Sequence, residues 1–303
     1  MNLKSLDPVY IETYNKGILK DRARQLHESL KCCNLCPRQC SVDRLSGETG
    51  TCSTGEYAMV SSYSPHFGEE APLVGNHGSG TIFFTHCNLL CSFCQNFDIS
   101  HEGRGRTVTD RELADMMLSL QALGCHNINF VTPSHVIPQI LSALLLAVED
   151  GLNIPLVYNS GGYDSPDTLR LLDGIIDIYM PDFKFWDPEP ARATCDAPDY
   201  PEIARKAIKE MHSQTGNLIL NHQGIATRGL LVRHLVMPEK MAGTEQIMNF
   251  LSGEISPETY VNIMPQYRPC GKAYQHEQLG RGISSAEFYD AIDLAKAAGI
   301  TRQ

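Results

Sequence analysis

Short apolar runs alternate with amphipathic windows along the chain from Thr81 onward. The runs have the length and continuous apolar character of strands buried on both faces, and the windows repeat their apolar positions with the period of a helix. Repeated strand-helix units of this kind predict a parallel sheet covered by helices. The six predicted strands span residues 81–85, 127–132, 154–158, 175–180, 229–236 and 260–264.

Two of the predicted helices carry their own start signals. Thr109 with Glu112, and Ser284 with Glu287, have the spacing of a capping box, in which each side chain bonds the other residue's backbone N–H. Apolar residues at helical spacing follow both boxes and also mark a third helix between them. The inward faces are expected to be Leu113, Met116, Met117 and Leu120; Ile203, Ile208 and Met211; and Phe288, Ile292 and Ala295.

The number of units limits the architecture. Six strand-helix units are too few for a complete eight-stranded barrel and fit either an open doubly wound sheet or a partial barrel, both of which bind ligands at the carboxyl ends of their strands. Before the first strand, glycines between Gly47 and Gly80 interrupt any long periodic element. We therefore expect an α/β fold in which residues 1–75 form an N-terminal extension and residues 76–303 form the strand-helix domain.

Charge and composition exclude several classes of protein. The 303-residue chain has 25 lysines and arginines against 35 aspartates and glutamates, a net charge of −10, which has the wrong sign for binding nucleic-acid phosphates. No apolar run approaches the length of a bilayer span, and residues 1–20 lack a signal-peptide pattern. We therefore expect a soluble cytoplasmic protein without nucleic-acid or membrane partners. In a reducing compartment, its 11 cysteines are expected to be metal ligands or catalytic groups rather than disulfides.

Three cysteines lie in the loop directly after the first predicted strand. Cys87, Cys91 and Cys94 are spaced CxxxCxxC, and one loop of this kind can wrap three thiolates around one cubane iron-sulfur cluster. Zinc or a conventional four-thiolate cluster needs a fourth protein ligand, and no fourth cysteine lies nearby in the sequence. The spacing therefore predicts a reactive 4Fe-4S cluster with one iron open to a small molecule. Unligated core thiols are the alternative.

This loop resembles the radical S-adenosylmethionine (SAM) superfamily, whose hallmark is CxxxCxxC with an aromatic residue before the last cysteine, here Phe93. The sequence from Gly78 through Asn96, and again over residues 229–238, is similar to the branch described as pyruvate formate-lyase activating enzyme-like. The resemblance covers most of the chain. It implies that the three cysteines bind three irons, that the amino and carboxylate groups of SAM chelate the fourth, and that Phe93 packs beside the adenine. A local core aromatic is the alternative for Phe93.

The resemblance also implies the reaction. An electron donor such as flavodoxin or ferredoxin reduces the cluster, one electron cleaves the sulfonium of SAM, and the resulting 5'-deoxyadenosyl radical abstracts hydrogen from a substrate. The family label favours hydrogen abstraction from a partner protein, as in the activation of a glycyl-radical enzyme. A small-molecule metabolite as substrate is the first alternative, and a non-catalytic iron-sulfur redox sensor is the second.

Strand ends supply the residues that the resemblance assigns to SAM. Where the family often has Gly-Gly-Glu to receive the ammonium group, this chain has Thr132 and Ser134, whose oxygens can accept the same hydrogen bonds. A helix-capping role is the alternative for Ser134. At the next two strand ends, the positions that help hold the SAM carboxylate, partly through a monovalent cation, are Asn159, Ser160, Met180 and Asp182.

Charge at these strand ends limits what can bind there. Asn159 stands where the family usually has aspartate, which removes one negative charge from the cation site. Lys184 can instead meet the SAM carboxylate directly, with an ordinary surface lysine as the alternative. Arg233 lies on the fifth predicted strand, where the family often has a basic residue and where a guanidinium suits a carboxylate or a ribose; an ordinary buried salt bridge is the alternative. Because side chains alternate along a strand, His234 is expected on the opposite face.

A second group of cysteines lies in the N-terminal extension. Cys33, Cys36, Cys40 and Cys52 are spaced CxxCxxxC and then eleven residues to the fourth thiol, with glycines that allow the chain to turn back. Four thiolates at this spacing predict either zinc or a second iron-sulfur cluster. Reduced, buried thiols packed as small apolar side chains are the alternative.

These patterns and the resemblance together predict one architecture and one reaction class. The architecture is a partial (β/α)6 TIM-type barrel with an N-terminal cysteine-containing extension. The reaction class is radical SAM chemistry, an oxidoreductase activity that depends on an iron-sulfur cluster. The sequence identifies no catalytic side chain beyond the residues that bind the cofactors.

Overall fold

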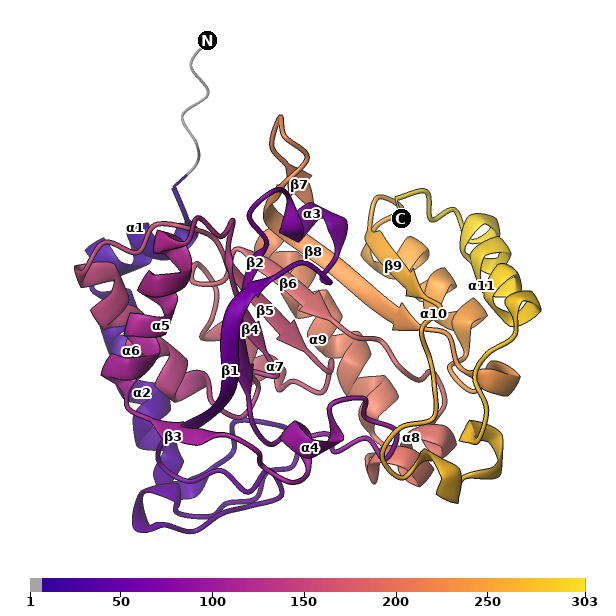
Figure 1. Cartoon of the computed structure of the whole chain (residues 1–303), viewed down its shortest axis with the longest axis horizontal. Helices are drawn as coiled ribbons and strands as arrows, with labels where there is room; N and C mark the ends of the chain where they lie inside the picture. Colours follow the sequence, from indigo (N-terminus) through magenta and orange to yellow (C-terminus); the bar gives the residue numbers. More distant parts are fainter. Residues whose placement is uncertain (1–6, 303) are drawn as a thin grey trace.

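A mixed sheet forms the centre of the protein (Figure 1). The structure is a computed structural model that describes residues 7–302. Within these residues the sheet has nine strands in the order β3-β1-β2-β4-β5-β6-β8-β7, with β9 paired to β8. The strands are β1 (Ala58–His66), β2 (Ser79–Phe84), β3 (Arg106–Val108), β4 (Ile128–Val131), β5 (Leu156–Ser160), β6 (Ile178–Pro181), β7 (Ile219–Leu220), β8 (Ala226–Leu235) and β9 (Tyr260–Met264).

Six of these strands run parallel as neighbours: β2, β4, β5, β6, β8 and β9. They are the six strands that the sequence predicts, with ends shifted by a few residues. A helix follows each of them, so the domain is a partial (β/α)6 barrel with a mostly parallel sheet. The helices that follow the strands are α5 (Asp110–Ala122), α6 (Ile137–Glu149), α7 (Pro166–Arg170), α9 (Tyr200–Thr215), α10 (Thr244–Phe250) and α11 (Ser285–Ala297).

Local sequence signals explain where two of the longer helices start. Thr109 and Glu112 form a complete capping box at the start of α5, and Ser284 and Glu287 form another at the start of α11, as predicted. The expected inward face of α5 is buried throughout. Within residues 7–302, no helix combines the length and the apolar composition that crossing a membrane requires.

The N-terminal part of the chain adds helices and antiparallel strands to this barrel. Helices α1 (Val9–Asn15) and α2 (Ile18–Glu28) contact α6, and β1 pairs antiparallel with β2 and with β3. The sequence did not predict β1, because much of the strand is exposed or only half-buried and glycine-rich segments flank it. The shorter elements are α3 (Ala71–Val74), α4 (Phe97–Ser100), α8 (Pro188–Cys195), the 3-10 turns η1 (Ser29–Cys32), η2 (Arg44–Ser46), η3 (Pro238–Lys240), η5 (Ala273–Gln275) and η6 (Glu277–Leu279), and the π turn η4 (Leu251–Ile255).

One apolar core extends across the predicted domain boundary. The boundary at residue 75 falls in the turn between α3 and β2. The main core cluster nevertheless includes Tyr10 from α1 as well as Ile300 near the C-terminus. Polar contacts reinforce this connection, because the Tyr10 hydroxyl donates to the Ile154 carbonyl at 2.9 Å and the Val9 N–H donates to Asp177 at 2.9 Å. Folding of the extension is therefore coupled to folding of the barrel.

A close approach of two strand ends generates a stability prediction. Gly162, after β5, has a φ of +76°, and a Cβ there would lie 2.2 Å from the Asp182 carbonyl oxygen. Gly151 has a φ of +95° but nothing within 4 Å of its Cβ position. We expect Gly151→Ala to lower the free energy of unfolding by about 1 kcal/mol through left-handed strain alone. Gly162→Ala should lower it by at least about 2 kcal/mol more, because the Asp182 segment must move. Urea denaturation of both variants measures the difference, and equal losses would contradict the packing argument.

Candidate functional site

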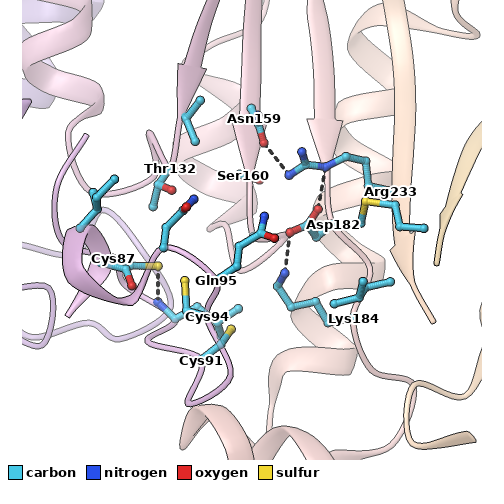
Figure 2. A pocket seen from close by; sticks show the side chains of 18 of the residues that line it. Cys87, Cys91, Cys94, Gln95, Thr132, Asn159, Ser160, Asp182, Lys184 and Arg233 are labelled. Carbon is cyan, nitrogen blue, oxygen red and sulfur yellow. Dashed lines mark hydrogen bonds and ion pairs between the residues drawn. The ribbon is translucent and has the colours of Figure 1, made fainter. Parts of the chain in front are cut away.

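A pocket of about 400 Å³ lies at the carboxyl ends of the parallel strands. This location follows from the topology, because the segments after parallel strands all emerge at one edge of the sheet. Figure 2 shows the cysteine loop facing the ends of the strands that carry Asn159, Asp182 and Arg233. Ten of the residues that the sequence assigned to cluster or SAM line this pocket: Cys87, Cys91, Phe93, Cys94, Thr132, Asn159, Ser160, Asp182, Lys184 and Arg233.

The cysteine loop joins β2 to α4. His86 and Leu90 have φ values of +65° and +53°, and these left-handed residues turn the chain on both sides of Cys87. The Leu89 N–H donates to the Cys87 sulfur at 3.4 Å, and the Cys94 N–H donates to the Cys91 carbonyl at 3.0 Å. The loop therefore holds its three thiols by its own backbone.

The buried environment keeps these thiols protonated in the protein alone. Burial raises the pKa of Cys87 to about 12 and also raises the pKa of Cys94. The neighbouring Cys195 thiol, together with burial, holds the pKa of Cys91 well above its ordinary value. Only a bound cationic group can stabilise three thiolates here, because metal coordination supplies the positive charge that burial in apolar surroundings lacks.

A chain of charged and polar side chains crosses the pocket opposite the loop (Figure 2). The Asp182 carboxylate accepts from Lys184 Nζ at 2.5 Å and from Arg233 Nε at 2.8 Å, and Arg233 Nη2 donates to Asn159 Oδ1 at 2.7 Å. Burial alone would raise the pKa of Asp182, but Arg233 and Lys184 hold it below its ordinary value. Asp182 is therefore ionised and keeps both cations at the pocket wall.

The far wall of the pocket comes from the segment that the sequence assigned to the extension. Glu70 Oε1 accepts from Asn262 Nδ2 at 3.1 Å and lies 3.9 Å from Arg233 Nη1. Its Oε2 atom is buried and has no hydrogen-bond partner among residues 7–302. Glu69 Oε1 lies 3.4 Å from His66 Nδ1, and burial raises the Glu69 pKa. Sequence reasoning missed this wall because β1, which positions it, lacks a clear strand pattern.

Comparison with known proteins decides the family. The model of the Radical SAM superfamily matches residues 81–251, more than half of the chain. The uncharacterized protein MJ0674 of Methanocaldococcus jannaschii is 33% identical over 292 residues, which cover 93% of this chain and 80% of that protein. The chain belongs to the radical SAM superfamily. A solved structure described as native anSMEcpe with bound AdoMet is similar at a TM-score of 0.48 and 10% identity, covering 70% of this chain and 57% of that one.

Membership of the superfamily gives the cofactors, a 4Fe-4S cluster and SAM. The pocket fits both. No group of three or more His, Cys, Asp or Glu side chains in the described part of the chain is arranged around a single metal ion. Three thiols on one loop, of which Cys91 is buried and Cys87 and Cys94 are half-buried, do match a cubane, in which each thiolate has its own iron. The two cations beside Asp182 match the carboxylate that SAM brings.

Two predicted SAM-binding residues do not line the pocket. Ser134 donates instead to Asp164 Oδ1 at 2.6 Å, and the N-cap of α6 is Val136, so the capping alternative for Ser134 is also wrong. The Met180 side chain packs in a small apolar cluster that includes Val157 and Ile178. Contacts with neighbouring elements hold both side chains away from the pocket, since the Asp164 carboxylate binds Ser134 and the apolar cluster packs around Met180.

Three further expectations concern the directions of Arg233 and His234, the packing of Phe93, and the monovalent cation. Arg233 faces the pocket and His234 is buried on the other side, bonded to the Phe183 carbonyl and Thr244, as alternation predicts. Phe93 packs edge-on against Phe185 at 5.9 Å. The predicted monovalent cation gains no support, because Asn159 and Asp182 direct their oxygens at Arg233 and Lys184.

Cys195 is a neighbour of the cluster loop that sequence reasoning missed. It ends α8, far from the loop in sequence, yet its thiol raises the pKa of the Cys91 thiol, and Cys195 does not line the pocket.

The position of Cys195 provides a matched control for the cluster ligands. We expect Cys91→Ala to lower cluster-derived absorption sharply and to remove about four irons per chain relative to the unchanged protein, because two thiolates cannot hold three irons of this cluster. Cys195→Ala should leave both the absorption and the iron content unchanged. Iron analysis of anaerobically reconstituted samples measures this, and the reverse pattern would exchange the assignments of the two cysteines.

The Asp182 network generates a binding prediction. Lys184→Ala should weaken SAM binding at least about tenfold, the value of one charge-assisted hydrogen bond, while the iron content stays unchanged. The exposed Lys206, whose amine contacts Glu202 on the same helix, provides the control Lys206→Ala. Calorimetric titration of SAM into both reconstituted variants tests this.

Asp182→Ala should lower stability as well as SAM affinity, because it leaves the cations of Lys184 and Arg233 unpaired. Equal SAM affinity in all three variants would remove this network from the binding site.

Proposed function

We propose that this radical SAM enzyme abstracts hydrogen from a small polar molecule that presents a hydrogen-bond-donating, cationic group to Glu69 and Glu70. The observation that carries the proposal is the composition of the pocket, whose three-thiol loop, cation network and acidic wall enclose one volume of about 400 Å³. This volume is within the range of pockets that bind small molecules.

The residues of the pocket divide between two tasks. Cys87, Cys91 and Cys94 provide thiolates for the cluster, and Lys184 and Arg233, held by Asp182, receive the carboxylate of SAM. Thr132 and Ser160 offer oxygens to its ammonium group, and Phe93 offers an aromatic face to its adenine. When bound, the cluster and SAM supply the one-electron cleavage that yields a 5'-deoxyadenosyl radical.

The far wall supports a cationic substrate because the positive groups that reach its carboxylates do so only at long range, His66 Nδ1 at 3.4 Å from Glu69 and Arg233 Nη1 at 3.9 Å from Glu70. Arg233 is 2.8 Å from Asp182 but 3.9 Å from Glu70, so its charge mainly offsets Asp182. The side chains of Glu69 and Glu70 are 8% and 6% exposed. A buried carboxylate without a partner is costly, and an ammonium or guanidinium group removes that cost. Glu70 Oε2 is the acceptor that remains for it.

Activation of a glycyl-radical enzyme stays a prediction from the resemblance to pyruvate formate-lyase activating enzymes. It requires a peptide segment to enter the same pocket. Superfamily enzymes need an electron donor, and flavodoxin or ferredoxin stays the predicted one. The redox-sensor alternative differs from both functions because it requires no SAM.

Cleavage of SAM tests the reaction class. The anaerobically reconstituted protein, given SAM and a chemical reductant, should form 5'-deoxyadenosine, and Cys91→Ala should form none above background. A sample with a full cluster and bound SAM that forms no 5'-deoxyadenosine would support the sensor instead.

Fractionated extract tests the substrate class separately. Extract of the source cells is divided into dialysable and macromolecular fractions, and each is added to the cleavage assay. We expect the dialysable fraction to stimulate 5'-deoxyadenosine formation, and Glu70→Gln to reduce this stimulation at least about tenfold through loss of one charge-assisted contact. Glu245→Gln, at an exposed position of α10, is the control. Stimulation by the macromolecular fraction alone would favour the glycyl-radical prediction and leave the reaction class intact.

A further inference from the structure

The cysteines of the extension surround a second cavity, separate from the catalytic pocket. It has a volume of about 10 Å³ and is lined by Cys33, Cys36, Cys40, Cys52 and, from the loop between β4 and α6, His135. Cys33, Cys36 and Cys52 are buried, at 9%, 9% and 8% exposure. Cys40 is half-buried at the rim, and Cys32 is exposed. A group of thiols from one segment thus meets an imidazole from the barrel.

The imidazole of His135 has an unused acceptor at this cavity. Its Nε2 lies 2.9 Å from the Thr85 carbonyl oxygen, an acceptor, so Nε2 carries the proton. Nδ1 therefore presents a lone pair in the neutral ring. His135 is 1% exposed, and Nδ1 has no hydrogen-bond partner among residues 7–302. A buried acceptor left in this state costs free energy that a ligand would recover.

Arg44 supplies a second, independent observation. Its side chain is 1% exposed and donates to the Gly55 carbonyl at 2.9 and 2.8 Å and to the His135 carbonyl at 2.9 Å. All of these acceptors are neutral, and Arg44 forms no ion pair with a carboxylate in the described part of the chain. The nearest anionic candidate is Cys33, whose sulfur lies 3.8 Å from Arg44 Nη1. A fully buried guanidinium of this kind needs negative charge nearby.

We propose that the thiolates of Cys33, Cys36 and Cys52 and Nδ1 of His135 bind an iron-sulfur cluster. A single zinc ion does not fit, because no group of three or more His, Cys, Asp or Glu side chains in residues 7–302 is arranged around one ion, whereas each ligand of a cubane binds its own iron. An oxidised 4Fe-4S core carries two positive charges, so three thiolates leave one net negative charge. Arg44 offsets that charge.

Cys40 differs from the three proposed thiolate ligands in its contacts. The Thr51 N–H donates to its sulfur at 3.4 Å, and the Thr51 hydroxyl lies 3.6 Å from it. Cys40 also lies between Gln39 and Ser41, with φ values of +42° and +54°, which fix its place at the rim. Its sulfur is therefore already partnered at the cavity edge.

The proposed centre would connect the extension to the catalytic pocket. His135 lies three residues after Thr132, which lines that pocket and has a φ of +62°. Ligation of His135 would fix the start of the β4–α6 loop relative to the extension. We assign the centre a structural role, with no electron or group transfer.

Metal analysis of variants tests the site. The background is the variant with Cys87, Cys91 and Cys94 all changed to alanine, which removes the catalytic cluster. After anaerobic purification, zinc, iron and sulfide are measured per chain, and circular dichroism and thermal unfolding report folding. We expect about four irons with sulfide per chain. A folded sample without iron, or with zinc in its place, overturns the proposal.

Ligand identity is tested with matched substitutions in the same background. Cys36→Ser and His135→Ala should lose the metal, whereas Cys40→Ser and His135→Cys should keep it, the latter because a thiolate replaces the imidazole. If Cys36→Ser or His135→Ala fails to fold, Cys40→Ser and His135→Cys still decide, because both are expected to keep the metal. The ligand set is overturned if both of these variants lose the metal. It is also overturned if Cys40→Ser loses the metal while His135→Ala keeps it.

Discussion

At the end of β6, the Asp182 carboxylate holds two buried cations, and the rest of the pocket depends on this arrangement. The side chains of Asp182, Lys184 and Arg233 are 12%, 14% and 18% exposed. Charges at this depth are tolerated only when they are paired, and breaking such a pair costs about 3 to 5 kcal/mol. Asp182 therefore fixes where the positive charge of the pocket lies, which is the charge that the carboxylate of SAM would meet in the proposed binding mode.

Arg233 connects the cofactor side of the pocket with the far wall. Its guanidinium contacts Asp182 and Asn159 and also lies near Glu70. A planar group with several fixed donors can serve these acceptors together, which a lysine cannot do. A charge bound at Glu69 and Glu70 would therefore act through Arg233 on the network that we propose for the SAM carboxylate. Binding of substrate and of cofactor is thereby expected to be electrostatically coupled.

The N-terminal segment is part of the functional architecture and not an appendage to the barrel. Strand β1 and the turn before α3 carry His66, Glu69 and Glu70 into the pocket, and the core cluster joins both parts of the chain. The cavity at Cys33, Cys36 and Cys52 gains its imidazole from the barrel. Each of these features needs both parts of the chain, so their stability and their chemistry are linked.

Local patterns were enough to predict the six parallel strands, the two capping boxes and the cysteine loop. Each depends on residues close in sequence, because a buried strand, a helix start and a CxxxCxxC loop all form within one short segment. Alternation along β8 likewise fixed the opposite directions of Arg233 and His234.

Only the tertiary structure decided which distant side chains meet. Cys195 approaches Cys91, His135 approaches the cysteines of the extension, and Glu70 approaches Asn262 and Arg233, all through the packing of separate elements. Ser134 and Met180 turn away for the same reason, since neighbouring elements and not local sequence choose which face of a strand end is buried. The sequence by itself determined the superfamily chemistry, because its three thiols lie on one loop. The pocket wall formed by Glu69 and Glu70 depends on contacts between segments far apart in the chain, so no local sequence pattern predicts it.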